Sequence, residues 1–135
     1  MGTFSADISR FVRKAQENAD KATQLIVYDL FRRVVEKTPV DEGTLRRSWV
    51  PSIGAPATGT SGEKPLQFAL TVKAGEVIYL TNNQPYAGVV EYGGYPNQPK
   101  GGAEKTINGY STQAPAGMVR TSIPETIAWA NKLKL

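Results

Sequence analysis

The sequence predicts an α+β fold, in which a long N-terminal helix and a kinked C-terminal helix pack on a small antiparallel β-sheet, with two long flexible loops. Three observations lead to this fold class. The first 37 residues carry an apolar stripe at helical spacing, residues 66–81 hold an alternating apolar pattern, and a second helical stripe begins after residue 116. The chain has 135 residues, the length of one domain, which we take as residues 1–135.

The N-terminal helix is expected over residues 5–37. Ser5 is a suitable N-cap, and Thr38 precedes Pro39, which disfavours helical geometry at Thr38. Such a helix is on the order of 50 Å long, whereas a small domain is about 30 Å across. Either one end frays or the helix curves over its own sheet, or part of the stripe overhangs and packs on another chain. The stripe consists of Ile8, Val12, Ala15, Ala19, Ala22, Ile26, Leu30 and Val34.

A turn and a short strand are expected after this helix. Pro39 and Gly43 bracket the turn, and Asp41 can accept backbone N–H groups at the start of a short helical turn that carries Leu45. A strand can begin at Trp49, although the proline two residues later restricts that strand to a sheet edge or end.

The strongest strand signal lies in residues 66–81. From residue 66 to 74, apolar and polar side chains alternate as in a half-buried strand. Gly75 permits a tight turn, and residues 76–81 return as the partner, which predicts an antiparallel hairpin. Residues 54–65, which precede the hairpin, are rich in Pro, Gly, Ser and Thr and are expected to form the first flexible loop.

A short helix is expected over residues 85–92. Pro85 suits its first position, Tyr86 lies on its apolar side, and Gly93 offers a left-handed C-cap. Residues 93–113 follow as an extended loop, because they contain many Pro, Gly and Asn residues and few aliphatic ones.

The C-terminal helix is expected over residues 116–133. Pro124 lies inside it and predicts a kink or a break, because proline lacks the N–H group that the helix needs. The apolar side of this helix consists of Val119, Ile123, Ile127 and Ala130.

The composition restricts the available chemistry. The 16 basic and 12 acidic residues give a net charge of +4, and they are mostly interspersed, as on solvated helix faces. Cysteine and histidine are both absent, which excludes disulfides, thiolate metal sites and the commonest general base near neutral pH. We expect no metal, no cofactor and no small-molecule substrate. The first residues resemble neither a signal peptide nor a myristoylation site, so we expect a soluble intracellular protein without a membrane partner.

Glu91 is the carboxylate that most invites a chemical role, because it stands among apolar residues. Acid–base catalysis would need a partner group and a polar cleft, and Asp41 and Glu42 are the only other carboxylates near a turn. We favour a structural role, in which backbone donors or an arginine hold the carboxylate. The candidate arginines are Arg46, Arg47 and Arg120, and the residues alone do not choose among them.

Three stretches together resemble the tail-component or neck family of long-tailed bacteriophages, whose members are called tail-completion or head–tail joining proteins. They are TPVDEGTLRRSW, NNQPYAGVVEYGG and QAPAGMVR, in this order after a long helix. The chain departs from the family pattern at Glu42, where a small polar residue is usual, and Pro124 has no counterpart that we can place. The matching positions are Thr38, Pro39, Val40, Asp41, Gly43, Leu45, Ser48, Asn83, Tyr86, Ala87, Glu91, Gly93, Ala114, Pro115, Met118 and Arg120.

The resemblance implies a structural virion protein without catalytic activity. It would form a homo-oligomeric ring, expected to be a hexamer, at the head–tail junction of the virion after assembly in the host cytoplasm. Its other partners would be neck, connector and tail-tube or terminator proteins, and DNA would pass through the ring without sequence-specific binding. Within this interpretation we expect Asp41 to cap the turn, and Glu91 and Arg120 to pair and so join the short helix to the C-terminal one.

Two other functions remain open from the residues. A nucleic-acid-binding accessory protein would need basic residues clustered on one side of the fold, and a small enzyme would need Glu91 and Asp41 in one polar pocket. The basic residues in question are Lys14, Lys21, Arg32, Arg33, Arg46 and Arg47.

Overall fold

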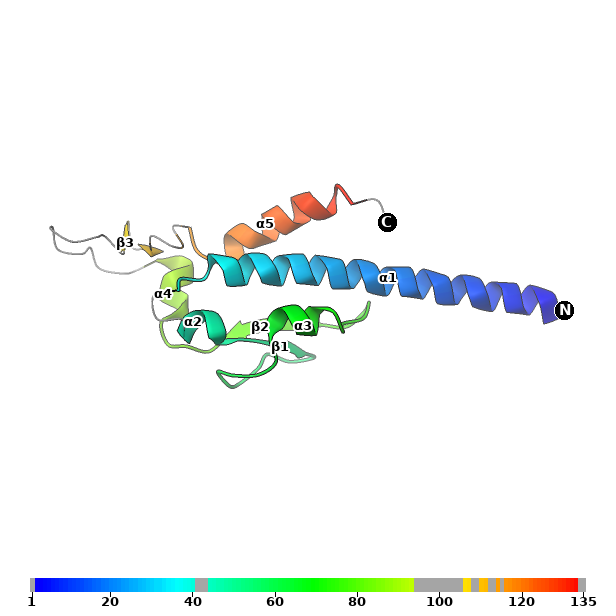
Figure 1. The fold of residues 1–135 in the computed structure, drawn as a ribbon, viewed down its shortest axis with the longest axis horizontal. Helices are drawn as coiled ribbons and strands as arrows, with labels where there is room; N and C mark the ends of the chain where they lie inside the picture. The colour runs from blue at the N-terminus through cyan, green and yellow to red at the C-terminus, as the bar shows by residue number, and fades with distance from the viewer. Residues whose placement is uncertain are drawn as a thin grey trace.

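The computed structural model describes residues 2–40, 44–93, 106–107, 110–111, 114 and 116–133. Its helices and small antiparallel sheet confirm the α+β fold class (Figure 1). The elements are α1 (Gly2–Lys37), α2 (Thr44–Arg47), β1 (Trp49–Ile53), α3 (Pro65–Ala69), β2 (Ile78–Asn82), α4 (Ala87–Tyr92), β3 (Thr106–Ile107), β4 (Tyr110–Ser111) and α5 (Val119–Ala130).

Helix α1 has 36 residues, which corresponds to about 54 Å. It ends where the sequence predicts, at Lys37: the Thr38 N–H bonds to the Val35 carbonyl at 3.1 Å, and the Thr38 hydroxyl donates to the Val34 carbonyl at 2.7 Å. The N-terminal half of α1 projects beyond all other elements (Figure 1). The overhang expected for this long helix is therefore observed, and its packing on another chain stays a prediction.

The other elements cover the C-terminal half of α1 from two sides. Helix α5 packs along one side, and α3 together with the β1–β2 sheet lies on the other (Figure 1). Between these layers the ends of α1, α2, α4 and α5 meet around one hydrophobic core. The buried core residues are Val34, Leu45, Trp49, Val90, Ala114 and Met118.

The main sheet pairs β1 with β2 in antiparallel register, from Trp49 opposite Asn82 to Ile53 opposite Ile78. The predicted hairpin over residues 66–81 is therefore wrong, although its second half does form a strand. A strand beginning at Trp49 is confirmed, and the two-stranded sheet leaves β1 an edge strand that tolerates Pro51.

The segment predicted as the first hairpin strand instead forms α3, which begins at Pro65, and a following turn. Ala69 and Val72 are fully buried while Leu70 is exposed, so burial follows a helical spacing rather than the alternation of a strand. Side chains from α1 hold the turn: the Gln24 amide donates to the Val72 carbonyl at 2.9 Å, and the Asp20 carboxylate accepts from the Ala74 N–H at 2.9 Å. These contacts with α1 select the helical conformation.

The two loops predicted from the sequence, residues 54–65 and 93–113, are confirmed in part. Residues 54–64 form neither helix nor strand, and the Asn83 side chain donates to the carbonyls of Ala57 and Gly59 at 2.8 and 2.9 Å. Within the expected extended loop 93–113, β3 and β4 form a small hairpin, and most of the remaining positions lie outside the described residues.

The two shorter helices also differ from the prediction in detail. Helix α4 begins at Ala87 rather than Pro85, and Gly93 has the expected positive φ of 84°, although its ψ of 179° lies outside the left-handed helical region. Helix α5 continues through Pro124 without a break. It buries Ser122 and Thr126. Of its predicted apolar side, Val119 packs against the core and Ala130 is half-buried, whereas Ile123 and Ile127 are exposed.

Candidate functional site

The junction between α4 and α5 is built around Glu91, which is only 8% exposed. One carboxylate oxygen accepts the backbone N–H groups of Met118 and Val119 at 2.6 and 2.7 Å, and the other accepts that of Arg120 at 2.9 Å. The first N–H groups of a helix have no partner within that helix, and its N-terminal dipole favours a negative charge. Glu91 of α4 therefore caps α5, which has no capping side chain of its own.

The predicted Glu91–Arg120 pair is confirmed. The Arg120 Nε lies 3.2 Å from the Glu91 carboxylate, and its terminal nitrogen donates to the Glu91 backbone carbonyl at 2.5 Å. The same guanidinium stacks over the Tyr92 ring at 4.8 Å and donates to the Tyr110 hydroxyl at 3.1 Å. Arg120 thus connects α4, α5 and the β3–β4 hairpin.

Gly117 allows α4 and α5 to approach this closely, and the sequence analysis missed it. Its φ is +90°, and a Cβ at this position would collide with the backbone oxygen of Glu91 and lie 3.0 Å from its Oε1. A glycine at the second position of the helix predicted over residues 116–133 was the available signal.

The geometry at Glu91 suits a permanent charge rather than proton transfer. Burial would raise the pKa of this carboxyl, but the N–H groups of Val119, Arg120 and Met118 and the Arg120 side chain outweigh burial and lower the pKa. Both oxygens are occupied by these donors. Asp41, the other carboxylate of the hypothetical enzyme, lies outside the described residues.

The first motif stretch ties the end of α1 to α2 and β1. Arg46 donates to the carbonyls of Glu36 and Thr38 at 2.9 Å, and so satisfies groups that the end of α1 leaves unpaired. The Trp49 indole donates to the Thr38 hydroxyl at 2.8 Å.

The remaining predicted motif residues contribute to the core or lie outside the described part. Leu45 and Met118 are buried in the core, and Tyr86 packs against it. Pro39 follows the end of α1 and is half-buried. The predicted roles of Asp41, Gly43 and Pro115 fall on positions outside the described residues.

Helices α1 and α5 meet along a polar seam centred on Asp29, which is buried. Its carboxylate accepts from Arg33 at 2.7 Å, from Arg32 at 3.0 Å and from the Thr126 hydroxyl at 2.8 Å. Burial would raise the pKa of Asp29, but these donors outweigh it and lower the pKa. An acid followed by arginines three and four residues later is a readable helical signal that the sequence analysis did not use.

Glu125 continues the seam towards the end of α1. It bonds to Lys37 at 2.6 Å and to Arg33 at 3.1 Å, and Lys37 also donates to the Thr121 hydroxyl at 2.9 Å. The α1 side of the seam therefore consists of residues spaced by one helical turn: Asp29, Arg33 and Lys37.

The same face of α1 continues towards the N-terminus as an apolar stripe, which is exposed except at the half-buried Ala22 and which we call the free stripe. Val12 is 56% exposed and Ile26 is 37% exposed. From residue 12 to 37 the steps along this face are three or four residues, so the free stripe and the α5 seam lie on one line. The free stripe consists of Val12, Ala15, Ala19, Ala22 and Ile26.

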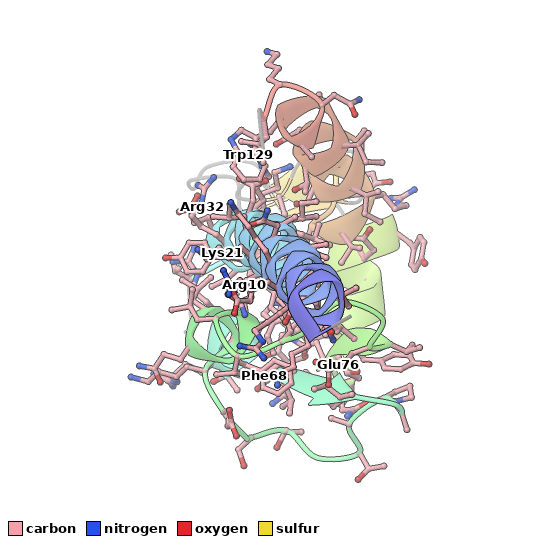
Figure 2. The ribbon with its side chains drawn as sticks, turned by 90° about the vertical axis from the view of Figure 1, so that its right-hand side faces the viewer. Arg10, Lys21, Arg32, Phe68, Glu76 and Trp129 are labelled. Atoms are coloured by element: carbon pink, nitrogen blue, oxygen red, sulfur yellow. The ribbon has the colours of Figure 1, made fainter. Side chains whose placement is uncertain are left out.

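The charged residues of this part of α1 lie on its opposite side. At 3.6 residues per turn, all five of those between residues 12 and 26 fall within about 120° of arc centred opposite the free stripe. Figure 2, which looks along α1 from its N-terminal end, shows Arg10, Lys21 and Arg32 on one side of the helix. The five residues are Arg13, Lys14, Glu17, Asp20 and Lys21.

The basic residues that a nucleic-acid-binding protein would use are only partly available. Arg32 and Arg33 pair with carboxylates, and Arg46 binds backbone carbonyls. Lys14, Lys21 and Arg47 form no ion pair with any residue that the structure describes. They are distributed between the overhang of α1 and helix α2.

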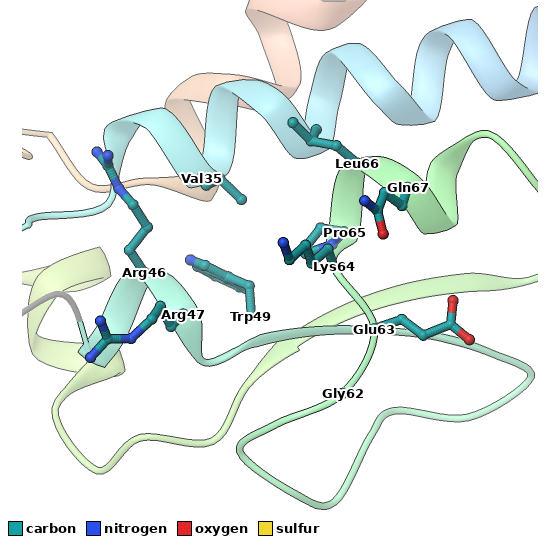
Figure 3. A pocket seen from close by; sticks show the side chains of 10 residues that line it. All are labelled: Val35, Arg46, Arg47, Trp49, Gly62, Glu63, Lys64, Pro65, Leu66 and Gln67. Carbon is teal, nitrogen blue, oxygen red and sulfur yellow. The ribbon is translucent and has the colours of Figure 1, made fainter.

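An open pocket of about 550 Å³ lies between α1, α2, β1 and the start of α3 (Figure 3). Val35, Trp49 and Leu66 form apolar walls, and Arg47 and Lys64 bring positive charge to its edge. Glu91 is not among the lining residues. The pocket is therefore an apolar recess whose charged lining residues are three basic ones and one acid, Glu63.

Among the described residues, no group of acidic side chains is arranged to hold a metal ion. None of the helices in the described part is both long and apolar enough to cross a bilayer. Comparison of the chain with protein-family models, curated proteins and solved structures found no significant match.

Proposed function

We propose that this protein is a structural subunit of a tailed bacteriophage, a neck or tail-completion protein that forms a homo-oligomeric ring at the head–tail junction. The proposal combines the resemblance of three sequence stretches with one structural observation that carries it. That observation is the overhang of α1, on which the free-stripe residues Val12, Ala15 and Ala19 are apolar and exposed.

An overhanging amphipathic helix is unusual for a protein that acts alone. Helices draw most of their stability from tertiary packing of an apolar face, and isolated helical segments shorter than about 12 to 15 residues are marginal in water. A neighbouring copy can supply that packing. When one copy contacts the next through two different surfaces, the assembly closes into a ring if the rotation allows.

The charge distribution is compatible with a ring around DNA. The net charge is +4, and Lys14 and Lys21 stand opposite the free stripe, where they remain accessible after the free stripe is covered. Such residues attract phosphates without reading sequence. The junction at Glu91 has a separate role in this proposal, because it fixes α5 to the body of the subunit.

Electron microscopy of phage particles tests the proposed location. The chain would be labelled within its exposed 54–64 loop, and gold-tagged antibody would be applied to intact virions and to free heads and tails. Label at the head–tail junction is expected, and particles made without the chain should contain unjoined heads and tails. Label on the capsid surface or the tail tip, or none on any particle, would contradict the proposal.

A further inference from the structure

Helix α5 carries an outward face that matches the free stripe in chemistry. Ile123 and Ile127 are 43% and 56% exposed, and Pro124 and Ala128 beside them are also exposed. The only charged residue between positions 123 and 131 is Glu125, which is turned towards α1 by its ion pairs. We call Ile123, Pro124, Ile127 and Ala128 the outer face of α5.

This helix is oriented in an unexpected way. Its hydroxyl side chains Ser122 and Thr126 are buried against the body, while its isoleucines face solvent. Both hydroxyls are satisfied, since Ser122 donates to the Met118 carbonyl at the start of its own helix at 2.5 Å and Thr126 donates to Asp29 of α1 at 2.8 Å. An exposed apolar face that is framed by polar residues marks an interaction surface.

We infer that the outer face of α5 in one copy packs on the free stripe of α1 in the next copy. This inference rests on the proposed ring and names its interface. The exposed part of the free stripe, from Val12 to Ala19, spans about 10 Å, and the outer face of α5, from Ile123 to Ala128, spans about 8 Å, so the two surfaces are similar in length. Two β-branched residues one turn apart form a ridge, and the alanines of the free stripe form the shallow groove that such a ridge needs.

The free stripe lies on the same line of α1 as the seam with the chain's own α5, and this supports α5 of a second copy as its partner. The chain's own α5 already packs on this line of α1 from Asp29 to Lys37. The neighbour's α5 would occupy the exposed segment of the same line, from Ala19 to Val12. Each α5 would then lie between two α1 helices, its hydroxyl side on its own α1 and its isoleucine side on the neighbour's α1.

The two surfaces are different, so the contact is heterologous and propagates from copy to copy. It also cannot form within one chain. Thr126 contacts Asp29, which lies about 15 Å along the helix axis from Ala19, and Ile127 is exposed rather than turned towards α1. A link between positions 19 and 127 therefore reports only contacts between copies.

Cysteine cross-linking tests this interface directly, because the natural chain has no cysteine. The double variant Ala19→Cys/Ile127→Cys is expected to form a ladder of covalent oligomers on mild oxidation, since a disulfide requires Cα atoms within about 7 Å. Equal amounts of the two single variants should give only a mixed dimer. The matched control, Lys21→Cys/Ile127→Cys, moves one thiol to the charged side of α1 and should give no ladder.

A second measurement separates association from folding. Ile127→Asp places a charge on the outer face of α5 at an exposed position, so the thermal unfolding of the monomer should change little. Concentration-dependent association, followed by analytical ultracentrifugation, should weaken by at least about tenfold because the carboxylate would be buried unpaired.

Three results would overturn the inference. Equal cross-linking of the Lys21→Cys control would show that the contact is unspecific, and efficient dimerisation of Ile127→Cys alone would show a two-fold α5–α5 contact. Rings that form in the wild type without any link between positions 19 and 127 would place the interface elsewhere while leaving the proposed ring intact. Failure of the proposed function is seen separately, in the location of the label on phage particles.

Discussion

At the scale of single residues, Glu91 joins two helices that are 26 residues apart in sequence. Its four charge-assisted hydrogen bonds reach Met118, which precedes α5, and the first two residues of α5, so one carboxylate determines where that helix starts. Arg120 and Gly117 complete the junction from the α5 side. The junction therefore depends on the charge of residue 91 and on the absence of a side chain at residue 117.

Replacing Glu91 with Gln should lower the free energy of unfolding by about 2 kcal/mol, because the amide accepts through one oxygen only and turns a donor towards the α5 N–H groups. Urea denaturation followed by circular dichroism measures this loss. The matched control is Glu125→Gln, whose ion pairs are more exposed and should contribute less than about 1 kcal/mol. Equal effects of the two variants would contradict the capping role.

Replacing Gly117 with Ala should destabilise the protein by at least about 2 kcal/mol more than replacing Gly75 with Ala. Both glycines have a φ near +90°, at 90° and 88°, so both variants carry the same backbone strain. Only at Gly117 would the added Cβ collide with Glu91, whereas nothing lies within 4 Å at Gly75. Thermal unfolding of the two variants compares them, and similar melting temperatures would show that the close approach is not required.

At the scale of elements, the two halves of α1 have different roles. Its C-terminal half contributes Phe31 and Val34 to the interior and carries the seam with α5. Its N-terminal half carries Val12, Ala15 and Ala19 of the free stripe, which are exposed in the isolated chain. The same helix thus serves the fold at one end and, in our proposal, the assembly at the other.

A chain that begins at Glu17 tests this division. Removing the preceding residues should reduce helical ellipticity but change the urea-derived free energy of unfolding by less than about 1 kcal/mol, because residues 12–16 are exposed. Its association should weaken. Phe31→Ala, which empties a buried site in the same helix, should cost about 3 to 5 kcal/mol. Loss of cooperative unfolding in the shortened chain would show that the overhang supports the fold.

At the scale of the whole molecule, two buried carboxylates connect the elements. Glu91 joins α4 to α5, and Asp29 joins α1 to α5. Both have pKa values below their ordinary ones, because hydrogen bonds and arginines outweigh burial. Protonation of either carboxyl weakens the attachment of α5. Low pH should therefore shift the position of the outer face of α5 as well as lower the free energy of unfolding.

Stability should therefore fall as the pH is lowered. A carboxyl with a lowered folded-state pKa contributes fully above its unfolded-state pKa, about 4 for Asp and Glu, and the contribution is lost as the pH falls through the folded-state pKa. The free energy of unfolding should decline below about pH 4 to 5 and do so less steeply in Glu91→Gln. With no histidine in the chain, no side chain has an ordinary pKa near 6.5. A steep change between pH 6 and 7 would contradict this assignment.

The sequence by itself determined the features that depend on neighbouring residues along the chain. Helical spacing predicted α1, and Thr38 before Pro39 predicted its end at Lys37. The α+β class, the short helix near Glu91 and the strand at Trp49 followed from similar local signals. The Glu91–Arg120 pair was predicted with the help of the family resemblance, and its geometry is confirmed.

Only the tertiary structure decided which surfaces are covered. The alternating residues 66–74 fit a strand or a helix, and contacts from Gln24 and Asp20 of α1 selected a helix and a turn. The strand partner of β2 proved to be β1, since pairing depends on what the rest of the fold leaves available. The exposure of the outer face of α5 could not be predicted from neighbouring residues in the sequence either. A hydroxyl can be buried once Asp29 accepts its hydrogen bond, and that acceptor lies 97 positions away in the chain.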